Sequence, residues 1–188
     1  NSVNDFLTCC AIGVVFANRL AEALDCPIGI INSNRGGTVI EEWLSAESLA
    51  ICGSSLPDNE LKNPESRDSR FYETMTSKFV GADLSIKGVL WYQGESNSYN
   101  TDIYQGQFEQ LVKQYREIFN DQNLPVICQQ LVQYSWIDYV NMRNVQWSCM
   151  EEIKNVYCSC GIDTGNVLGG PDEIHAPEKI IIGTRMAA

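Results

Sequence analysis

Histidine is nearly absent from this sequence, since His175 is the only one among 188 residues. Metal sites built from several histidines, histidine relays and multi-histidine pH switches are therefore excluded. The eight cysteines include no Cys-x-x-Cys pair, which argues against a structural zinc site or a thioredoxin-type motif. We expect no metal and no cofactor, and any proton transfer by an imidazole must use His175.

Positive charge is also scarce, because 13 Lys and Arg stand against 24 Asp and Glu, a net charge of −11. Nucleic-acid binding requires a basic surface, so no nucleic-acid partner is expected. No apolar run approaches the roughly 18 residues of a membrane span, and no signal peptide or Asn-x-Ser/Thr site is visible. The composition and these absences leave the cellular compartment unknown.

Apolar residues make up 44% of the chain and recur with helical and strand periods in alternation. Helices are expected at about 5–24, 38–50, 71–83, 102–119, 138–154 and 177–188, strands at 27–31, 86–92, 126–132 and 156–160, and a long surface loop at 52–70. This alternation predicts an α/β fold whose parallel sheet is covered on both faces. No linker or repeat divides the chain, so residues 1–188 are expected to form a single domain.

Polar segments follow three of the expected strands. They are residues 32–38, 93–97 and 172–175, and the last contains the single histidine. In an open parallel sheet, ligands bind at the carboxyl ends of the strands. We therefore expect these three segments to meet at one edge and to form the functional site.

Two of these segments carry groups that suit a developing oxyanion. Gly36 and Gly37 allow the backbone to approach a ligand closely and to direct N–H groups at it, and the Gln93 amide is a further donor. Glu95 and Asn97 could orient the loop after the second strand. The alternative is a strand-to-helix turn that simply needs glycine, followed later by a polar turn that satisfies its own backbone.

The third segment pairs a carboxylate with the histidine. Asp172 lies three residues before His175, a spacing at which the carboxylate can accept the Nδ1–H of the imidazole. Nε2 is then available to take a proton from a hydroxyl nucleophile. Glu173 and Glu178 are neighbouring carboxylates that could replace Asp172. The alternative is a helix-capping aspartate beside a surface histidine.

At this point the motifs resemble a known family. Two stretches of the sequence are similar to two blocks of the sialate O-acetylesterase family. They are residues 28–43 and residues 88–97, and the second contains the string Trp-Tyr-Gln-Gly-Glu-Ser-Asn. This family belongs to the SGNH hydrolase superfamily and is close to the acetylxylan esterases. Asp172 and His175 match the superfamily's Asp-x-x-His block, and residues 100–104 and 179–186 are also family-like.

The resemblance implies a three-layer α/β/α sandwich with a mainly parallel, flavodoxin-like sheet. It implies a carboxylic ester hydrolase that removes acetyl groups from carbohydrates of the sialic acid or xylan type by a Ser-His-Asp mechanism without a metal or cofactor. The resemblance assigns His175 as the general base and Asp172 as the residue that orients it. It assigns Gly36, Gly37 and Gln93 as oxyanion donors. It assigns substrate contacts to Arg35, Glu95 and Asn97. A secreted, periplasmic or lysosomal location is also implied.

Two features concern the substrate more closely. Arg35 stands where many relatives carry an aromatic residue, and we hypothesise that it meets an anionic substrate such as the carboxylate of a sialic acid. The alternative is an ion pair with Glu41 or Glu42. Several aromatic side chains could stack on sugar rings or belong to the core. They are Trp43, Trp91, Tyr92, Tyr99 and Trp136.

The family's nucleophile motif, a Gly-Gln-Ser-Asn-like string after the first strand, is missing, and no Gly-x-Ser-x-Gly elbow is present. Serines 33, 96, 98 and 135 follow strands, and Ser33 and Ser96 are expected to be structural. We therefore expect a domain truncated at the N-terminus and a sheet without its first strand. The open edge would favour a separate N-terminal chain or a homo-oligomer. Activity of this chain alone stays open, and the alternative is an inactive SGNH-like domain that binds sugars or proteins.

Overall fold

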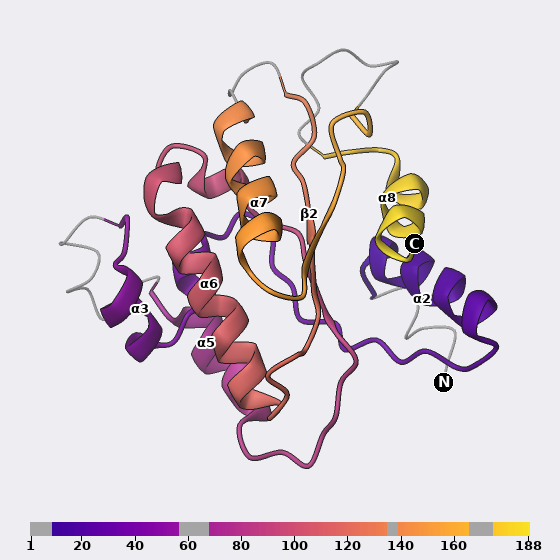
Figure 1. Cartoon of the computed structure of the whole chain (residues 1–188), viewed down its shortest axis with the longest axis horizontal. Helices are drawn as coiled ribbons and strands as arrows, with labels where there is room; N and C mark the ends of the chain where they lie inside the picture. Colours follow the sequence, from indigo (N-terminus) through magenta and orange to yellow (C-terminus); the bar gives the residue numbers. More distant parts are fainter. Residues whose placement is uncertain (1–8, 57–67, 135–138, 166–174) are drawn as a thin grey trace.

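The computed structural model of the chain describes residues 9–56, 68–134, 139–165 and 175–188 (Figure 1). In chain order the elements are helix α2 (Ala11–Leu24), the 3₁₀ helix η1 (Ile40–Trp43), α3 (Ala46–Cys52), α5 (Arg70–Thr74), η2 (Thr76–Phe79), strand β1 (Val89–Trp91), η3 (Glu95–Asn97), α6 (Thr101–Ile118), β2 (Val126–Gln129), α7 (Val140–Glu152), β3 (Val156–Ser159) and α8 (Lys179–Met186).

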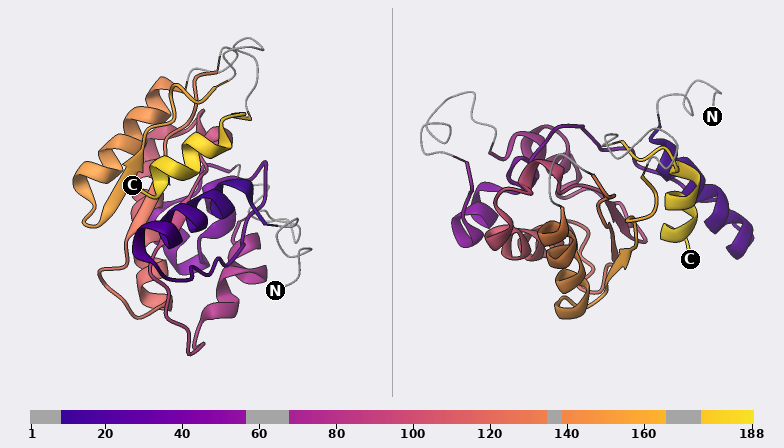
Figure 2. Two further views of the ribbon diagram at one scale, coloured as in Figure 1. Left: turned by 90° about the vertical axis from the view of Figure 1, so that its right-hand side faces the viewer. Right: turned by 90° about the horizontal axis from the view of Figure 1, so that it is seen from above.

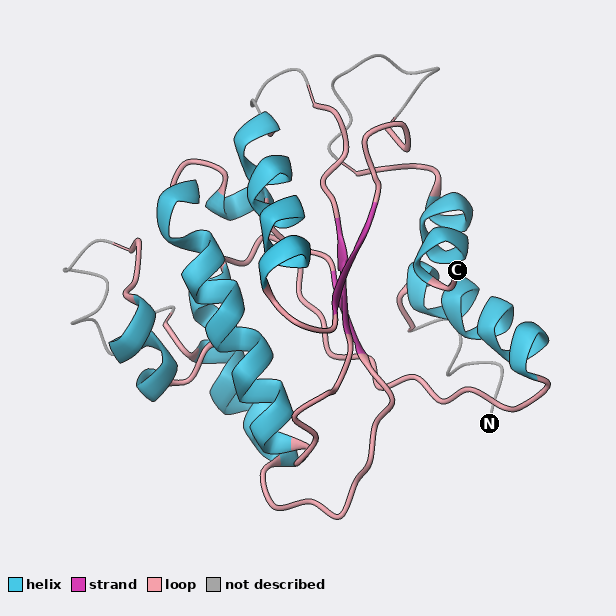
Figure 3. Cartoon of the chain, in the orientation of Figure 1, coloured by secondary structure: helices cyan, strands magenta, loops and turns pink. Residues whose placement is uncertain are grey.

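The strands form a parallel sheet in the order β1-β2-β3 at the centre of the molecule (Figure 3). Val89 aligns with Val126, which in turn aligns with Val156, so the three strands start level with one another. Parallel neighbours need crossover helices, and α6 and α7 provide them. The expected parallel sheet and α/β class are confirmed.

One face of the sheet packs against α6, α7, α5 and η1. The inward side of α6 carries Tyr104, Phe108, Leu111 and Val112, which are all fully buried and recur at helical spacing. These side chains join the buried residues of β1, β2 and β3 in the larger hydrophobic core. Burial of this apolar stripe stabilises the fold and fixes α6 against the sheet.

The other face of the sheet is covered by α2 and α8, which pack on each other (Figures 1 and 2). Ile12 of α2 and Ile182 of α8 form a second core with Val132, and Leu90 and Ile127 of the strands pack against it. Helices on both faces of the sheet give the three layers that the motifs implied. Within the described residues no helix is long and apolar enough to cross a membrane.

The strand expected at residues 27–31 is wrong. This segment is not a strand, and Ile30 and Ile31 are 36% and 50% exposed. An apolar run becomes a strand only when a neighbouring strand takes its N–H and C=O groups. Within the described part of the chain, residues 27–31 make no backbone hydrogen bond to another segment.

The single helix expected at residues 38–50 is also wrong. The chain forms η1 and α3 instead, and Ser45 separates them because its hydroxyl accepts the N–H of Ser48 and begins a new helix. Val39 is the residue at the start of η1, and its N–H donates to the Glu42 carboxylate at 2.9 Å. Similarly, the helix expected at 71–83 is divided into α5 and η2.

Candidate functional site

Hydrogen bonds join the segment that follows Arg35 to the segment that follows β1, and the two segments form one unit. Gln93 follows β1, and its Nε2 donates to the Thr38 carbonyl at 3.0 Å and to Asn97 Oδ1 at 2.7 Å. The backbone N–H of Ile40 donates to the same Asn97 oxygen at 2.9 Å. Segments more than 50 residues apart in the sequence are therefore held together by side-chain amides.

Glu41 lies beneath this junction and is completely buried. Its carboxylate accepts the Nδ2–H of Asn97 at 2.9 Å, the Nε2–H of Gln107 at 3.0 Å and both the N–H and the hydroxyl of Ser55, at 3.0 and 2.5 Å. Burial opposes ionisation of Glu41, but the hydrogen bonds from Ser55 and Asn97 outweigh it and lower its pKa. A buried anion thus organises the unit.

The side-chain amide and the backbone carbonyl of Gln93 are both hydrogen-bonded within the protein. Its Oε1 accepts the hydroxyl of Tyr104 at 2.9 Å, and that hydroxyl accepts the indole N–H of Trp91 at 3.2 Å. The Gln93 carbonyl accepts the amide of Gln146 at 3.1 Å. Both N–H donors of the Gln93 amide are therefore used within the protein, on Thr38 and on Asn97. In this arrangement Gln93 fixes the turn before Thr38 and does not present a donor to solvent.

The turn before Thr38 is exposed. Gly36 and Gly37 form it, and Gly37 has a φ of +72°, a conformation that glycine adopts without strain. The Thr38 hydroxyl donates to the Arg35 carbonyl at 3.1 Å and accepts the indole N–H of Trp43 at 3.0 Å, which closes the turn. Its position beside Gln93 brings the expected backbone donors to the edge of the unit.

Arg35 is exposed at this turn. Within the described residues it forms no ion pair with Glu41 or Glu42, and both of those carboxylates are buried and accept hydrogen bonds from other groups. The Arg35 side chain is therefore exposed next to Gly36 and Gly37.

Glu95 brings the C-terminal segment to the same place. This carboxylate is half-buried in η3, and its burial raises its pKa, while its electrostatic interactions with His175 and Lys179 act in the opposite direction. Lys179, the first residue of α8, also lies 6.0 Å from the centre of the Tyr92 ring. Glu95, His175 and Lys179 are thus electrostatic neighbours at the carboxyl end of β1.

His175 itself is exposed. Of the carboxylates expected to orient it, Asp172 and Glu173 lie outside the described residues, whereas Glu178 is exposed as the residue that caps α8. The helix that follows His175 is anchored by Arg185, whose guanidinium binds both oxygens of Asp163 at 2.5 and 2.7 Å. This pairing lowers the Asp163 pKa to about 2 and ties α8 to the loop after β3.

The serines near the site differ in their surroundings. The Ser33 hydroxyl contacts the Met75 sulfur at 3.5 Å, and the Ser98 hydroxyl donates to the Glu95 carbonyl at 2.8 Å. Ser96 lies exposed in η3 between Glu95 and Asn97. Ser135 is outside the described residues. The described serines thus fulfil local roles or face solvent beside Glu95.

The aromatic candidates separate clearly. Trp43 and Trp91 are buried and pack edge to face at 6.1 Å in the core, and Tyr92 is half-buried. Tyr99 is 75% exposed and lies two residues after the end of η3. Trp136 lies outside the described residues. Tyr99 is therefore the described member of this group that retains an open ring face.

Sequence reasoning did not identify Glu41, Gln107 or Lys179 as parts of this region. The sequence indicated Glu41 only as an alternative ion-pair partner of Arg35, because its burial depends on η1 turning it inward. A usable signal existed, since a carboxylate within an apolar motif block must find hydrogen-bond donors when buried. No comparable local signal marks Gln107 or Lys179. Within the described residues no cluster of three or more His, Cys, Asp or Glu could hold a metal ion.

Comparisons with known proteins agree with the motifs. A family model described as "Carbohydrate esterase, sialic acid-specific acetylesterase" matches residues 6–188. The sialate O-acetylesterase of Homo sapiens is 40% identical over 115 residues, which cover 58% of this chain and 21% of that protein. A probable carbohydrate esterase of Arabidopsis thaliana is 31% identical over 121 residues, which cover 61% of this chain and 39% of that protein.

A similar fold is present in a solved structure. The crystal structure of a carbohydrate acetylesterase from Xanthomonas citri matches with a TM-score of 0.74 and 29% sequence identity. The match covers 94% of this chain and 39% of the Xanthomonas chain. This chain therefore spans well under half the length of each of these three relatives.

Proposed function

Because the chain belongs to the sialic acid-specific acetylesterase family of carbohydrate esterases, we propose that it forms part of a carboxylic ester hydrolase that removes acetyl groups from sugars. One observation carries the proposal. The turn at Gly36 and Gly37 is held by Gln93, and Glu95 of the same unit is an electrostatic neighbour of His175, the single histidine. A backbone donor turn and an imidazole at one edge are the parts that acyl transfer requires.

The proposed mechanism uses His175 as the general base. Its Nε2 takes the proton of a serine hydroxyl while the serine oxygen bonds to the acetyl carbonyl carbon. The sugar oxygen then leaves with that proton. Water attacks the acetyl-serine, His175 again accepts a proton, and the proton returns to the serine oxygen as acetate departs. Asp172 is proposed to orient the imidazole, and Glu95 is a second carboxylate whose charge stabilises the imidazolium.

The tetrahedral intermediate in each step carries a negative oxygen. We assign its stabilisation to the backbone at Gly36 and Gly37, and we assign Gln93 the role of positioning this turn through the Thr38 carbonyl. Preorganised donors of this kind need no rearrangement during the reaction, which makes them effective in catalysis. Asn97 is assigned a positioning role as well, because it is buried and links Gln93 to Glu41.

The experiment that tests this function combines labelling with product analysis. The protein that carries this chain is treated with a fluorophosphonate probe, the labelled serine is identified by peptide mapping, and acetate release from O-acetylated sugars is measured in parallel. We expect one labelled serine and protection by the acetylated sugar. Absence of both labelling and acetate release in the folded protein would refute the proposal.

A second candidate function is sugar binding without hydrolysis. The observation that favours it is that both amide donors of Gln93 already bond within the protein. In that case the same edge would bind a sugar while fluorophosphonate labelling and acetate release are both absent. Sugar binding measured by titration, together with these two negative results, would establish this alternative.

A further inference from the structure

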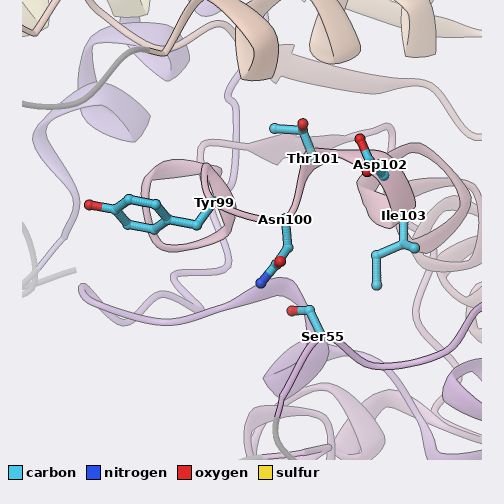
Figure 4. Close-up of a pocket in the computed structure, with 6 residues that line it drawn as sticks. All are labelled: Ser55, Tyr99, Asn100, Thr101, Asp102 and Ile103. Atoms are coloured by element: carbon cyan, nitrogen blue, oxygen red, sulfur yellow. The ribbon is translucent and has the colours of Figure 1, made fainter.

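A hollow lies beside the proposed esterase site, at the start of α6. Its volume is about 240 Å³, and its lining residues are Ser55, Tyr99, Asn100, Thr101, Asp102 and Ile103 (Figure 4). We propose that this hollow binds one neutral sugar unit of the glycan that carries the acetyl ester. The inference rests on the proposed function for its substrate class, but its chemistry can be tested without any hydrolysis.

The groups that face the hollow suit sugar hydroxyls. In Figure 4 the side chains of Asn100 and Ser55 point toward each other across it, and Ile103 lies beside them. The Ser55 hydroxyl donates to Glu41, so its oxygen is available to accept a hydrogen bond. Asn100 makes no side-chain cap bond to α6, and within the described residues its amide has no partner. It therefore offers two donors and one acceptor.

The charge of the lining indicates a neutral ligand. None of the six lining residues is Lys, Arg or His, and Asp102 contributes a carboxylate. A sialic acid carboxylate would be repelled there, also by the net charge of −11. Arg35, the residue that we associate with anionic substrates, is not among the lining residues. The hollow consequently favours hexose or pentose units over acidic sugars.

The size and rim of the hollow indicate one sugar ring. Its volume of about 240 Å³ lies below the roughly 300–1,000 Å³ of pockets that hold drug-sized ligands. Tyr99 stands at the rim with its ring projecting away from the other lining side chains (Figure 4) and is 75% exposed. An exposed ring at the rim offers a flat apolar face on which the next sugar unit of the same glycan can stack.

The hollow is connected to the esterase site through short covalent and hydrogen-bonded links. Tyr99 and Asn100 lie two and three residues after the end of η3, and the Asn100 N–H donates to the Asn97 carbonyl at 2.9 Å. On the opposite wall, Ser55 binds Glu41, which in turn binds Asn97. A glycan seated in the hollow therefore lies on the same rigid unit as Gln93, which suits a subsite next to the reacting sugar.

The test is an NMR titration of the protein with xylotetraose, a neutral oligosaccharide that carries no acetyl ester. We expect shifts of the amide signals of Ser55 and of residues 99–103. Tyr99→Ala and Asn100→Ala should each weaken binding about fivefold, in line with the loss of one stacking or hydrogen-bonding contact. Tyr157→Ala and Asn144→Ala, which remove exposed side chains outside the lining, are the matched controls and should bind as the wild type.

Each outcome decides the proposal. Shifts confined to this region, with weaker binding in both lining variants, would support it even if the protein proved to have no esterase activity. Unchanged affinity in both lining variants, or no binding of xylotetraose by the folded wild type, would overturn it. Tighter binding of N-acetylneuraminic acid than of xylotetraose at these residues would overturn the assignment to a neutral sugar.

Discussion

At the scale of single residues, two carboxylates that lie far apart in the chain, Glu41 and Glu95, behave in opposite ways. Glu41 is buried among donors that hold its pKa below its ordinary value. Burial raises the pKa of Glu95, and the nearby charges of His175 and Lys179 reduce that rise without cancelling it. Glu41 stabilises the fold as an anion. Burial of Glu95 near His175 instead disfavours its charged form, and shifted pKa values of this kind are common among catalytic groups.

Glu95→Gln should make the protein more stable at neutral pH. The raised pKa means that the folded state binds more protons than the unfolded state above pH 4.5, so stability falls as the pH rises through the folded pKa. A glutamine at this position does not ionise, so the variant avoids this loss of stability. The difference in melting temperature between variant and wild type should vanish below pH 4.5. Melting temperatures at pH 7 and pH 4 measure it, with exposed Glu117→Gln as control. A lower melting temperature for Glu95→Gln at pH 7 would contradict the account.

Glu41→Gln should have the opposite effect. The lowered pKa contributes stability above about pH 4.5 that is lost as the pH falls through the folded pKa. The glutamine replaces one acceptor oxygen with an NH2 donor that faces the donors of Asn97 or Gln107, with a loss of about 1–3 kcal/mol at pH 7. Urea unfolding at several pH values measures the loss, which should shrink in acid. A constant difference at all pH values would show that the charge of Glu41 is unimportant.

Arg35→Ala tests the assignment of that residue to anionic substrates. The catalytic efficiency of the protein toward an O-acetylated sialic acid should fall about tenfold, the cost of one charge-assisted hydrogen bond. Efficiency toward a neutral acetylated sugar should stay within about twofold. Arg19→Ala removes an exposed arginine on α2 and serves as the control for net charge. An unchanged preference between the two sugars would refute the assignment.

At the scale of elements, periodicity predicted the strands and long helices well. The expected helix at 102–119 is α6, Thr101–Ile118, because four large apolar side chains recur on one face. The expected strand at 27–31 failed because pairing, unlike periodicity, is not local. The break at Ser45 was missed because Glu41 and Glu42 turn inward to buried hydrogen-bond donors, an effect that helix patterns do not encode.

The contact between α2 and α8 gives a prediction at this scale. A Cβ on Gly183 would lie 2.7 Å from Val15 Cβ and 2.9 Å from the Ile12 carbonyl, so Gly183→Ala must push the two helices apart. We expect a loss of about 1–3 kcal/mol in unfolding free energy. Gly106→Ala in α6 meets nothing within 4 Å and should instead stabilise by roughly 0.5–1 kcal/mol. Equal effects of the two substitutions would contradict the close packing.

At the scale of the whole molecule, strand-end reasoning placed residues 36–38 and 93–97 at one edge, and the hydrogen bonds of Gln93 agree with that placement. The direction of the Gln93 amide could not be predicted, because it depends on Asn97, Tyr104 and Thr38 together. The role of Glu95 beside His175 also required the folded chain, since α8 sets the position of that segment. Motifs identified the parts, and packing determined how they face one another.

The central claim is that a single imidazole performs the proton transfers of an acetyl-ester hydrolysis. The most direct test is the catalytic efficiency of acetate release from an O-acetylated sugar by the protein with and without His175→Gln, with Asn144→Ala as a folded control. The account predicts a fall on the order of a millionfold, as for the loss of a catalytic histidine in a serine hydrolase. Efficiency within tenfold of the wild type in a folded His175→Gln protein would contradict it.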